Sequence, residues 1–349
     1  MSKQSVVLTE LICDKLKSSM TEAVINQTAI DIAGELRCNV PAFKGNRLNL
    51  EKHVLKSLAK KKDFQIYIHY IKNPRSYTET FITEQVETLL GTEYKDKCQS
   101  FFVTNISNLQ THIRQALQEV SKKIKSQNGD TFKEFTTIIK DKLTFDSIPS
   151  ENFTDVNFDF LKEQMEKGLD VIGADLKKLS VDKLKKSRQR PDQILIDQLC
   201  DCCWEKCPFC GAVCTNTVKD HKIAKEGGID HSVPFHRSGS LKGCHYRHTV
   251  KMSLDFCTTK VASDSSFYPD ASDRTVPHKT YRSAGPPYDT WSITPDLFKL
   301  SYWQWVVCTF KDDLEKHYNL KYEGRGEIPK EWKEITFEEA IRSLEEMYK

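Results

Sequence analysis

The sequence predicts a mainly α protein, in which an elongated helical bundle or arm is followed by a small α+β module and by C-terminal helices. Three observations lead to this prediction. Apolar residues recur with helical spacing over 1–190, cysteines, histidines, glycines and aromatics crowd into 191–295, and helical spacing returns in 296–349. We therefore expect three parts with these boundaries, since a chain of 349 residues exceeds one ordinary domain of about 100–200 residues.

Helical spacing is clearest in residues 102–124, where apolar side chains are separated by three or four positions. Such spacing places them on one face of a helix, while Arg114 and Lys122 fall on the opposite face. Comparable stripes follow in 132–143 and 161–179. Each apolar face must be buried against other helices, which predicts a bundle. The three stripes consist of Phe102, Ile106, Leu109, Ile113, Leu117, Val120 and Ile124, of Phe132, Phe135, Ile138, Ile139 and Leu143, and of Leu161, Met165, Leu169, Ile172, Leu176 and Leu179.

The helical period disappears in the middle part, residues 191–295. Apolar residues at every second position of 250–256 predict a strand with one buried face. In the last part, Thr336 and Glu339 have the spacing of a capping box, which marks the beginning of a helix. We therefore expect irregular β structure in the middle part and an ordered helical tail.

Charge and hydropathy exclude some classes of protein. With 52 basic and 49 acidic side chains, the net charge of +3 gives only a weak general attraction for polyanions. No apolar stretch reaches the ~18–20 residues needed to cross a bilayer, which argues against a membrane span. Thr9 and Glu10 interrupt the beginning of the chain before a signal-type apolar region can form. We therefore expect no secretion signal and a location in the cytoplasm, with the nucleus as a further location.

In a reducing compartment, the twelve cysteines of this chain are not expected to form disulfides. Cysteines that cluster with histidines are better interpreted as metal ligands. The scattered Cys13, Cys38 and Cys98 are expected to be small core residues.

Cys207 and Cys210 form a Cys-x-x-Cys motif, in which a tight turn brings two thiolates to one ion and Gly211 relieves crowding. His231 and His236 follow with the spacing of the histidine half of a Cys2His2 zinc site. A closed site with four protein ligands leaves no open position for an activated water. The sequence therefore predicts a structural zinc ion that is held by these two cysteines and two histidines and that staples the middle part.

The surplus of cysteines and histidines leaves alternatives open. Cys200 and Cys203 form a second Cys-x-x-Cys, which either binds a second ion or packs as thiols at the end of a helix. Packing is favoured because only three residues separate Cys203 from Cys207. The metal roles of the other nearby residues stay open, namely those of Cys214, His221, Cys244, His245 and His248.

The sequence lacks the motifs of the catalytic alternatives. It contains neither the His-Glu-x-x-His of a zinc protease nor the His-x-Glu of a zinc deaminase. A phosphate-binding loop needs Gly-Lys before Ser or Thr, and the chain has no Gly-Lys dipeptide. A zinc hydrolase would need a carboxylate base, for which Asp230 is the candidate. We favour two other roles for Asp230, either orienting His231 or lying in the turn made by Gly227 and Gly228. We therefore expect neither enzyme activity nor a nucleotide site.

Residues 177–190 form the strongest basic cluster. One interpretation is that its side chains bind phosphates. The other is that they lie in solvent at a helix end, where cations interact favourably with the negative end of the helix dipole. The first interpretation predicts binding to nucleic acid or to an anionic surface. The cluster consists of Lys177, Lys178, Lys183, Lys185, Lys186, Arg188 and Arg190.

A family resemblance rests first on three segments, Trp204–Ala212, Asp230–Arg237 and Thr290–Asp296. These segments are similar to the C-terminal end of the interferon-induced very large GTPases. The resemblance covers nearly the whole chain, because it continues upstream through Ala29–Gly34, Arg37–Phe43 and Tyr67–Ile71.

The resemblance implies giant dynamin-related proteins of interferon-driven innate defence, found in cytosol and nucleus, with a guanine-nucleotide domain ahead of this region. The GTP-binding residues of that family have no matching positions here, so the resemblance implies a chain without a GTP site. With the apolar stripes and the closed metal site, it favours a non-catalytic assembly or scaffold region. The expected partners are further copies of this chain or other GTPases of the family.

Overall fold

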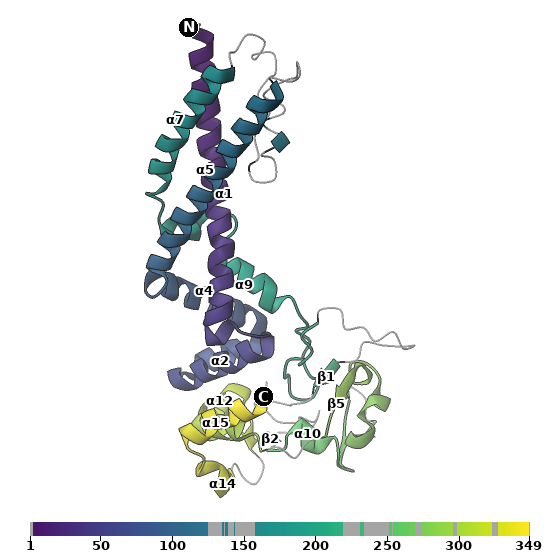
Figure 1. The fold of residues 1–349 in the computed structure, drawn as a ribbon. Coiled ribbons are helices and arrows are strands. Elements are labelled where there is room, and N and C mark those ends of the chain that lie inside the picture. Colours follow the sequence, from purple (N-terminus) through teal and green to yellow (C-terminus); the bar gives the residue numbers. More distant parts are fainter. Residues whose placement is uncertain are drawn as a thin grey trace. The chain divides into compact units, whose positions relative to one another are not determined.

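The computed structural model consists mainly of helices (Figure 1). It describes residues 3–124, 135, 137, 138, 143, 158–218, 231–233, 251, 252, 254–269, 274–295, 299–322 and 327–348. Strands within these residues are two or three residues long. The predicted class, mainly α with a small α+β part, is confirmed.

The elements follow one another in the order α1 Lys3–Asn39, η1 Pro41–Phe43, α2 Arg47–Lys61, α3 Phe64–Lys72, α4 Pro74–Gly91, α5 Lys95–Ile124, α7 Phe158–Leu176, α8 Val181–Lys186, α9 Pro191–Cys200, β1 His231–Val233, β2 Lys251–Met252, α10 Cys257–Lys260, β3 Ser266–Phe267, β4 Val276–Pro277, η3 His278–Ala284, η4 Tyr288–Thr290, β5 Trp291–Ile293, α11 Ser301–Thr309, α12 Lys311–Tyr318, β6 Lys321–Tyr322, α14 Lys330–Lys333 and α15 Phe337–Met347.

The chain divides into two compact units. Unit 1 consists of Met1–Arg37 and Thr83–Ile194, and unit 2 consists of Cys38–Ile82 and Leu195–Lys349. This grouping differs from the three consecutive parts suggested by the sequence, because α2 and α3 pack with the C-terminal helices. The division at residues 190 and 295 stays a prediction.

Unit 1 is a helical bundle in which α1, α5 and α7 lie side by side (Figure 1). Asn105 of α5 donates to Asp31 of α1 at 2.8 Å, and Gln110 of α5 donates to the carbonyl of Leu169 in α7 at 2.8 Å. A side chain at Gly173 would displace the amide group of Gln110 from this position, so glycine leaves room for its hydrogen bond to Leu169. These contacts fix the neighbours of α5.

The apolar stripes predicted from the sequence form the core of unit 1. On α5, every stripe residue from Phe102 to Val120 is buried, and on α7 the same holds for the residues from Met165 to Leu176. Phe135 is buried as well, whereas Phe132 and Ile139 lie outside the described residues. The helical interpretation is therefore confirmed for the stripe on α5 and, up to Leu176, for the stripe on α7, which ends before Leu179.

The scattered cysteines differ from one another. Cys98 is buried and Cys13 is half-buried, but Cys38 is exposed at the end of α1. The prediction that all three are core residues is therefore wrong for Cys38, because the last turn of α1 leaves this side chain in solvent.

In unit 2, α2 and α3 pack against the C-terminal helices. The buried hydroxyl of Tyr302, in α11, donates to the carbonyl of Leu55 at 2.7 Å and lies 2.7 Å from the hydroxyl of Tyr67. The ring of Tyr67 also contacts that of Phe310, with the centroids 5.1 Å apart. The capping box predicted at Thr336 is present, with both of its hydrogen bonds.

The strands of unit 2 form three short pairs within the described residues. Strands β1 and β5 are parallel, β2 and β6 are parallel, and β3 and β4 are antiparallel. The strand expected over 250–256 is shorter in the structure, since β2 spans only Lys251–Met252 and the helix α10 begins at Cys257. None of the helices within the described residues is long and apolar enough to cross a membrane.

Glu345 in α15 joins the C-terminal helices to α2 through ion pairs with Lys56 and, at 2.9 Å, Lys52. These two ammonium groups lower the pKa of the Glu345 carboxyl to about 2. Because the pKa is depressed on folding, the ion pairs stabilise the protein above the unfolded pKa of about 4.3 and lose this effect as the pH falls towards 2.

Replacing Glu345 with glutamine is therefore expected to lower the free energy of unfolding at pH 7 by less than about 1 kcal/mol, since the carboxylate is half exposed. Urea unfolding of both proteins should show this difference shrinking between pH 4.5 and pH 3. Exposed Glu346 provides the matched control, Glu346→Gln. Equal losses in the two variants would contradict the ion-pair explanation.

Candidate metal centre

The Cys-x-x-Cys motif lies at the tip of a short hairpin, residues 205–214. The amide of Cys214 donates to the carbonyl of Glu205 at 2.8 Å, and the amide of Cys207 donates to the carbonyl of Ala212 at 2.8 Å. At the turn, the amide of Gly211 donates back to Cys207 at 2.8 Å, and the φ of Gly211 is 74°. Glycine adopts this left-handed conformation without strain, so the turn can close and present both thiols.

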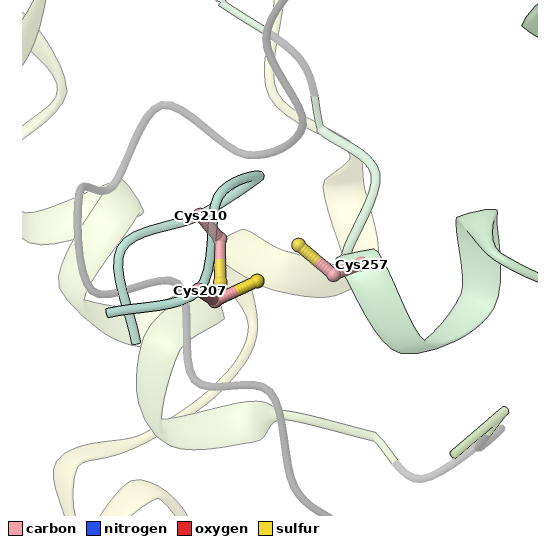
Figure 2. Close-up of side chains that lie close together, drawn as sticks. All are labelled: Cys207, Cys210 and Cys257. Atoms are coloured by element: carbon pink, nitrogen blue, oxygen red, sulfur yellow. The ribbon is translucent and has the colours of Figure 1, made fainter. Parts of the chain in front are cut away.

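A third cysteine completes the group. Cys257 is the first residue of α10, and its sulfur lies with those of Cys207 and Cys210 so that all three atoms are within 4.8 Å of one another. Figure 2 shows the three sulfurs gathered between the hairpin and α10. Around a tetrahedral zinc ion with Zn–S distances of about 2.3 Å, sulfurs would be about 3.8 Å apart. The group is therefore close to the spacing that such an ion requires.

The surroundings of the three thiols are apolar. Cys207, Cys210 and Cys257 are each at most 3% exposed and belong to a cluster rich in aromatic side chains. Phe209, between the two cysteines of the motif, contacts Phe267 at 4.9 Å and Tyr288 at 5.1 Å between ring centroids. Water is thereby kept from the sulfur atoms.

Burial raises the pKa of the Cys207 thiol well above its usual value, and the neighbouring Cys210 thiol raises it further. Three thiolates in such a pocket would repel one another without a compensating cation. A soft divalent ion such as zinc supplies that charge and binds thiolates directly. The residues present therefore fit a metal ion.

Of the two predicted histidine ligands, the structure describes the backbone of His231 but not His236. His231 is the first residue of β1, and the strand register pairs it with Trp291 of β5. Trp291 belongs to the cluster that contains the three cysteines. His236 lies outside the described residues. The assignment of both histidines as ligands stays a prediction.

The second Cys-x-x-Cys does not join the three-cysteine group within the described part of the chain. Cys200 ends α9, and both Cys200 and Cys203 are buried. Burial raises the pKa of the Cys200 thiol to about 12. A hydrogen bond with Cys203, together with burial, also raises the pKa of the Cys214 thiol. These features agree with packed thiols. The other residues whose roles were open, His221, Cys244, His245 and His248, lie outside the described residues.

Cys257 was not among the ligands predicted from the sequence. It has no cysteine two or three positions away, so no local motif distinguishes it from the scattered cysteines. Only the folding of α10 against the hairpin brings it to Cys207 and Cys210. Only the tertiary structure therefore identifies Cys257 as a candidate ligand.

Fold and site together define a helical protein whose unit 2 contains a group of buried cysteines. Residues 203–344, which lie in unit 2, match the family described as "Interferon-induced very large GTPase 1, C-terminal domain". The match includes all three cysteines of the group. No solved structure matches the chain.

Two curated relatives are similar over almost the whole chain. The mouse protein named "Interferon-induced very large GTPase 1" is 35% identical over 341 residues, and the human protein of the same name is 34% identical over 341 residues. The similarity covers 95% of this chain but only 14% of each relative. The resemblance to the C-terminal region of the interferon-induced very large GTPases is thereby confirmed.

Proposed function

We propose that this chain is a non-catalytic assembly or scaffold region with a structural zinc ion, acting in the interferon-driven defence that the family resemblance implies. The observation that carries the proposal is the buried group of Cys207, Cys210 and Cys257. We also propose a location in the cytoplasm and nucleus, where reduced thiols remain available to zinc.

A structural role for zinc is supported by the chemistry of its surroundings. A catalytic zinc ion needs an open position for water and a base close to it. The three thiols are instead buried among aromatic rings, and within the described residues no carboxylate belongs to the group. Zinc would therefore connect the hairpin to α10 and stabilise unit 2.

His231 is our proposed fourth ligand. Its pairing with Trp291 brings the β1 backbone to a strand of the three-cysteine cluster, and an imidazole is a common companion of three thiolates on zinc. His236 is the alternative that the sequence spacing offers. Zinc content of His231→Ala and His236→Ala would separate the two.

The zinc proposal is tested by metal analysis of the purified full chain, prepared with an excess of reductant. We expect about one zinc ion per chain, with release by a strong chelator that also lowers the thermal stability of the protein. If the purified protein contained no zinc and the metal-free protein also failed to bind added zinc, the proposal would be overturned.

Assembly is supported by apolar side chains on the surface of unit 1. Leu11, Ile30, Val103 and Val171 are between 41% and 65% exposed, and Val171 is the most exposed of them. We expect light scattering to show a mass that rises with protein concentration, and Val171→Glu to reduce this rise. A strict monomer at high concentration would contradict homotypic assembly.

Binding to a polyanion is a second candidate function. In the described part of the chain no ion pair engages Lys177, Lys183, Lys185, Lys186 or Arg188, and all five side chains are exposed. Exposed cations of this kind can displace counterions from phosphates.

This second function predicts salt-dependent binding of RNA, DNA or anionic vesicles. Replacing Lys183, Lys185 and Lys186 together with glutamine should weaken it, while the same replacement at Lys60, Lys61 and Lys62 provides a control on another surface. Absence of binding at low salt would exclude this function.

A further inference from the structure

A buried arginine connects α2 to the hairpin that carries Cys207 and Cys210. Arg47, the first residue of α2, is 1% exposed. Its guanidinium donates to Glu51 at 2.9 Å and to the backbone carbonyl of Cys214, and it lies over the ring of Trp204, 5.1 Å from the centroid. These partners offset much of the loss of water around this charge.

Glu51 is compensated as well. One of its carboxylate oxygens accepts from Arg47, and the other accepts from the hydroxyl of Tyr70 at 3.0 Å. A buried ion pair is stable only when such additional hydrogen bonds satisfy its partners. The orientation of the guanidinium is thereby fixed from the side of α2 and α3.

The contacts of Arg47 fall on both sides of the hairpin base. Trp204 precedes the first strand of the hairpin, and Cys214 ends the second, where its amide donates to Glu205. A second support lies nearby, because the ammonium of Lys206 donates to the carbonyl of Lys72 at the end of α3, at 2.7 Å. The base of the hairpin is therefore attached to the segment 38–82.

We propose that Arg47 is a positioning residue for the metal centre, and that the segment 38–82 is a required part of the zinc-binding domain. This inference rests on the proposed zinc site. It goes beyond the family match, which begins at residue 203 and does not include this segment.

The physical reason is preorganisation. A two-stranded hairpin is marginally stable by itself, and its two thiols reach one ion only in the correct register. By holding Trp204 and Cys214 at the base, Arg47 fixes the register that places Cys207 and Cys210 at the tip. Support of ligands from outside the first coordination sphere typically changes metal affinity by about 10–100-fold.

The experiment measures zinc release from the full chain to an excess of a colorimetric chelator, together with zinc affinity by chelator competition. Arg47→Met is compared with Arg75→Met, a matched control in which exposed Arg75 pairs with half-buried Glu79. We expect about 10–100-fold weaker zinc binding in Arg47→Met and a change within about twofold in Arg75→Met. Arg47→Lys should retain part of the affinity.

Trp204→Leu serves if Arg47→Met does not fold, because Trp204 is only half-buried and its loss removes one partner of the guanidinium. It should also weaken zinc binding. Wild-type zinc affinity in whichever of these two variants folds, even with lowered thermal stability, would overturn the positioning role. Absence of zinc from the wild-type chain would instead overturn the proposed function, so the two failures are distinguishable.

Discussion

Replacing Cys257 with serine is expected to remove zinc from the chain and to destabilise unit 2. A serine hydroxyl is a poor zinc ligand, and a site that loses one of its thiolates loses most of the binding energy that supports folding. A loss of about 3 kcal/mol would lower the melting temperature by about 6–12 °C in a domain of this size. Metal analysis and thermal unfolding of the purified variant measure both effects.

The matched control for this experiment is Cys308→Ser. Cys308 lies in α11 of the same unit, is half-buried, and is outside the three-cysteine group. This variant should keep its zinc and most of its stability. Full zinc content in Cys257→Ser would show that Cys257 is not a ligand, whereas Cys207→Ser would still test the hairpin.

Replacing Glu51 with leucine is expected to lower the free energy of unfolding by about 3–5 kcal/mol, because it leaves the buried Arg47 charge without its carboxylate. The double variant Arg47→Met/Glu51→Leu should be less destabilised than Glu51→Leu alone, since it removes both charges together. Urea unfolding at neutral pH measures the two free energies. This comparison separates the cost of an unpaired charge from the loss of the pair itself.

The partly exposed pair of Arg75 and Glu79 supplies the control for this prediction. Glu79→Leu should change stability by less than about 1 kcal/mol, as for other surface ion pairs. A double variant that is as unstable as the sum of its single variants would contradict the coupling of Arg47 with Glu51.

Local patterns in the sequence were sufficient to predict α5, α7 and the capping box of α15. The stripe from Phe102 to Val120 reports its buried face directly, because helical periodicity is encoded within a few turns. Grouping of α2 and α3 with the C-terminal helices was not predictable in this way. It depends on contacts such as that between Tyr67 and Tyr302, which are separated by more than two hundred residues and leave no local pattern.

The candidate site shows the same limit. Cys207, Cys210 and Gly211 form a motif because a single tight turn requires them together. Cys257 and Arg47 come from distant segments, and the type of residue alone does not identify either of them. Arg47 carried no prediction at all, since a buried charge is recognised only once its partners Glu51 and Trp204 are in place.

The discontinuous composition of unit 2 has a consequence for synthesis on the ribosome. Its first segment, Cys38–Ile82, emerges before the stretch Thr83–Ile194 of unit 1, and its partner helices α11 and α15 emerge only after that stretch. Side chains such as Tyr67 therefore stay without their packing partners in α11 while the second segment of unit 1 is translated. Long-range pairings of this kind slow folding and prolong exposure of apolar surface, so the nascent chain should depend on chaperones until α15 is complete.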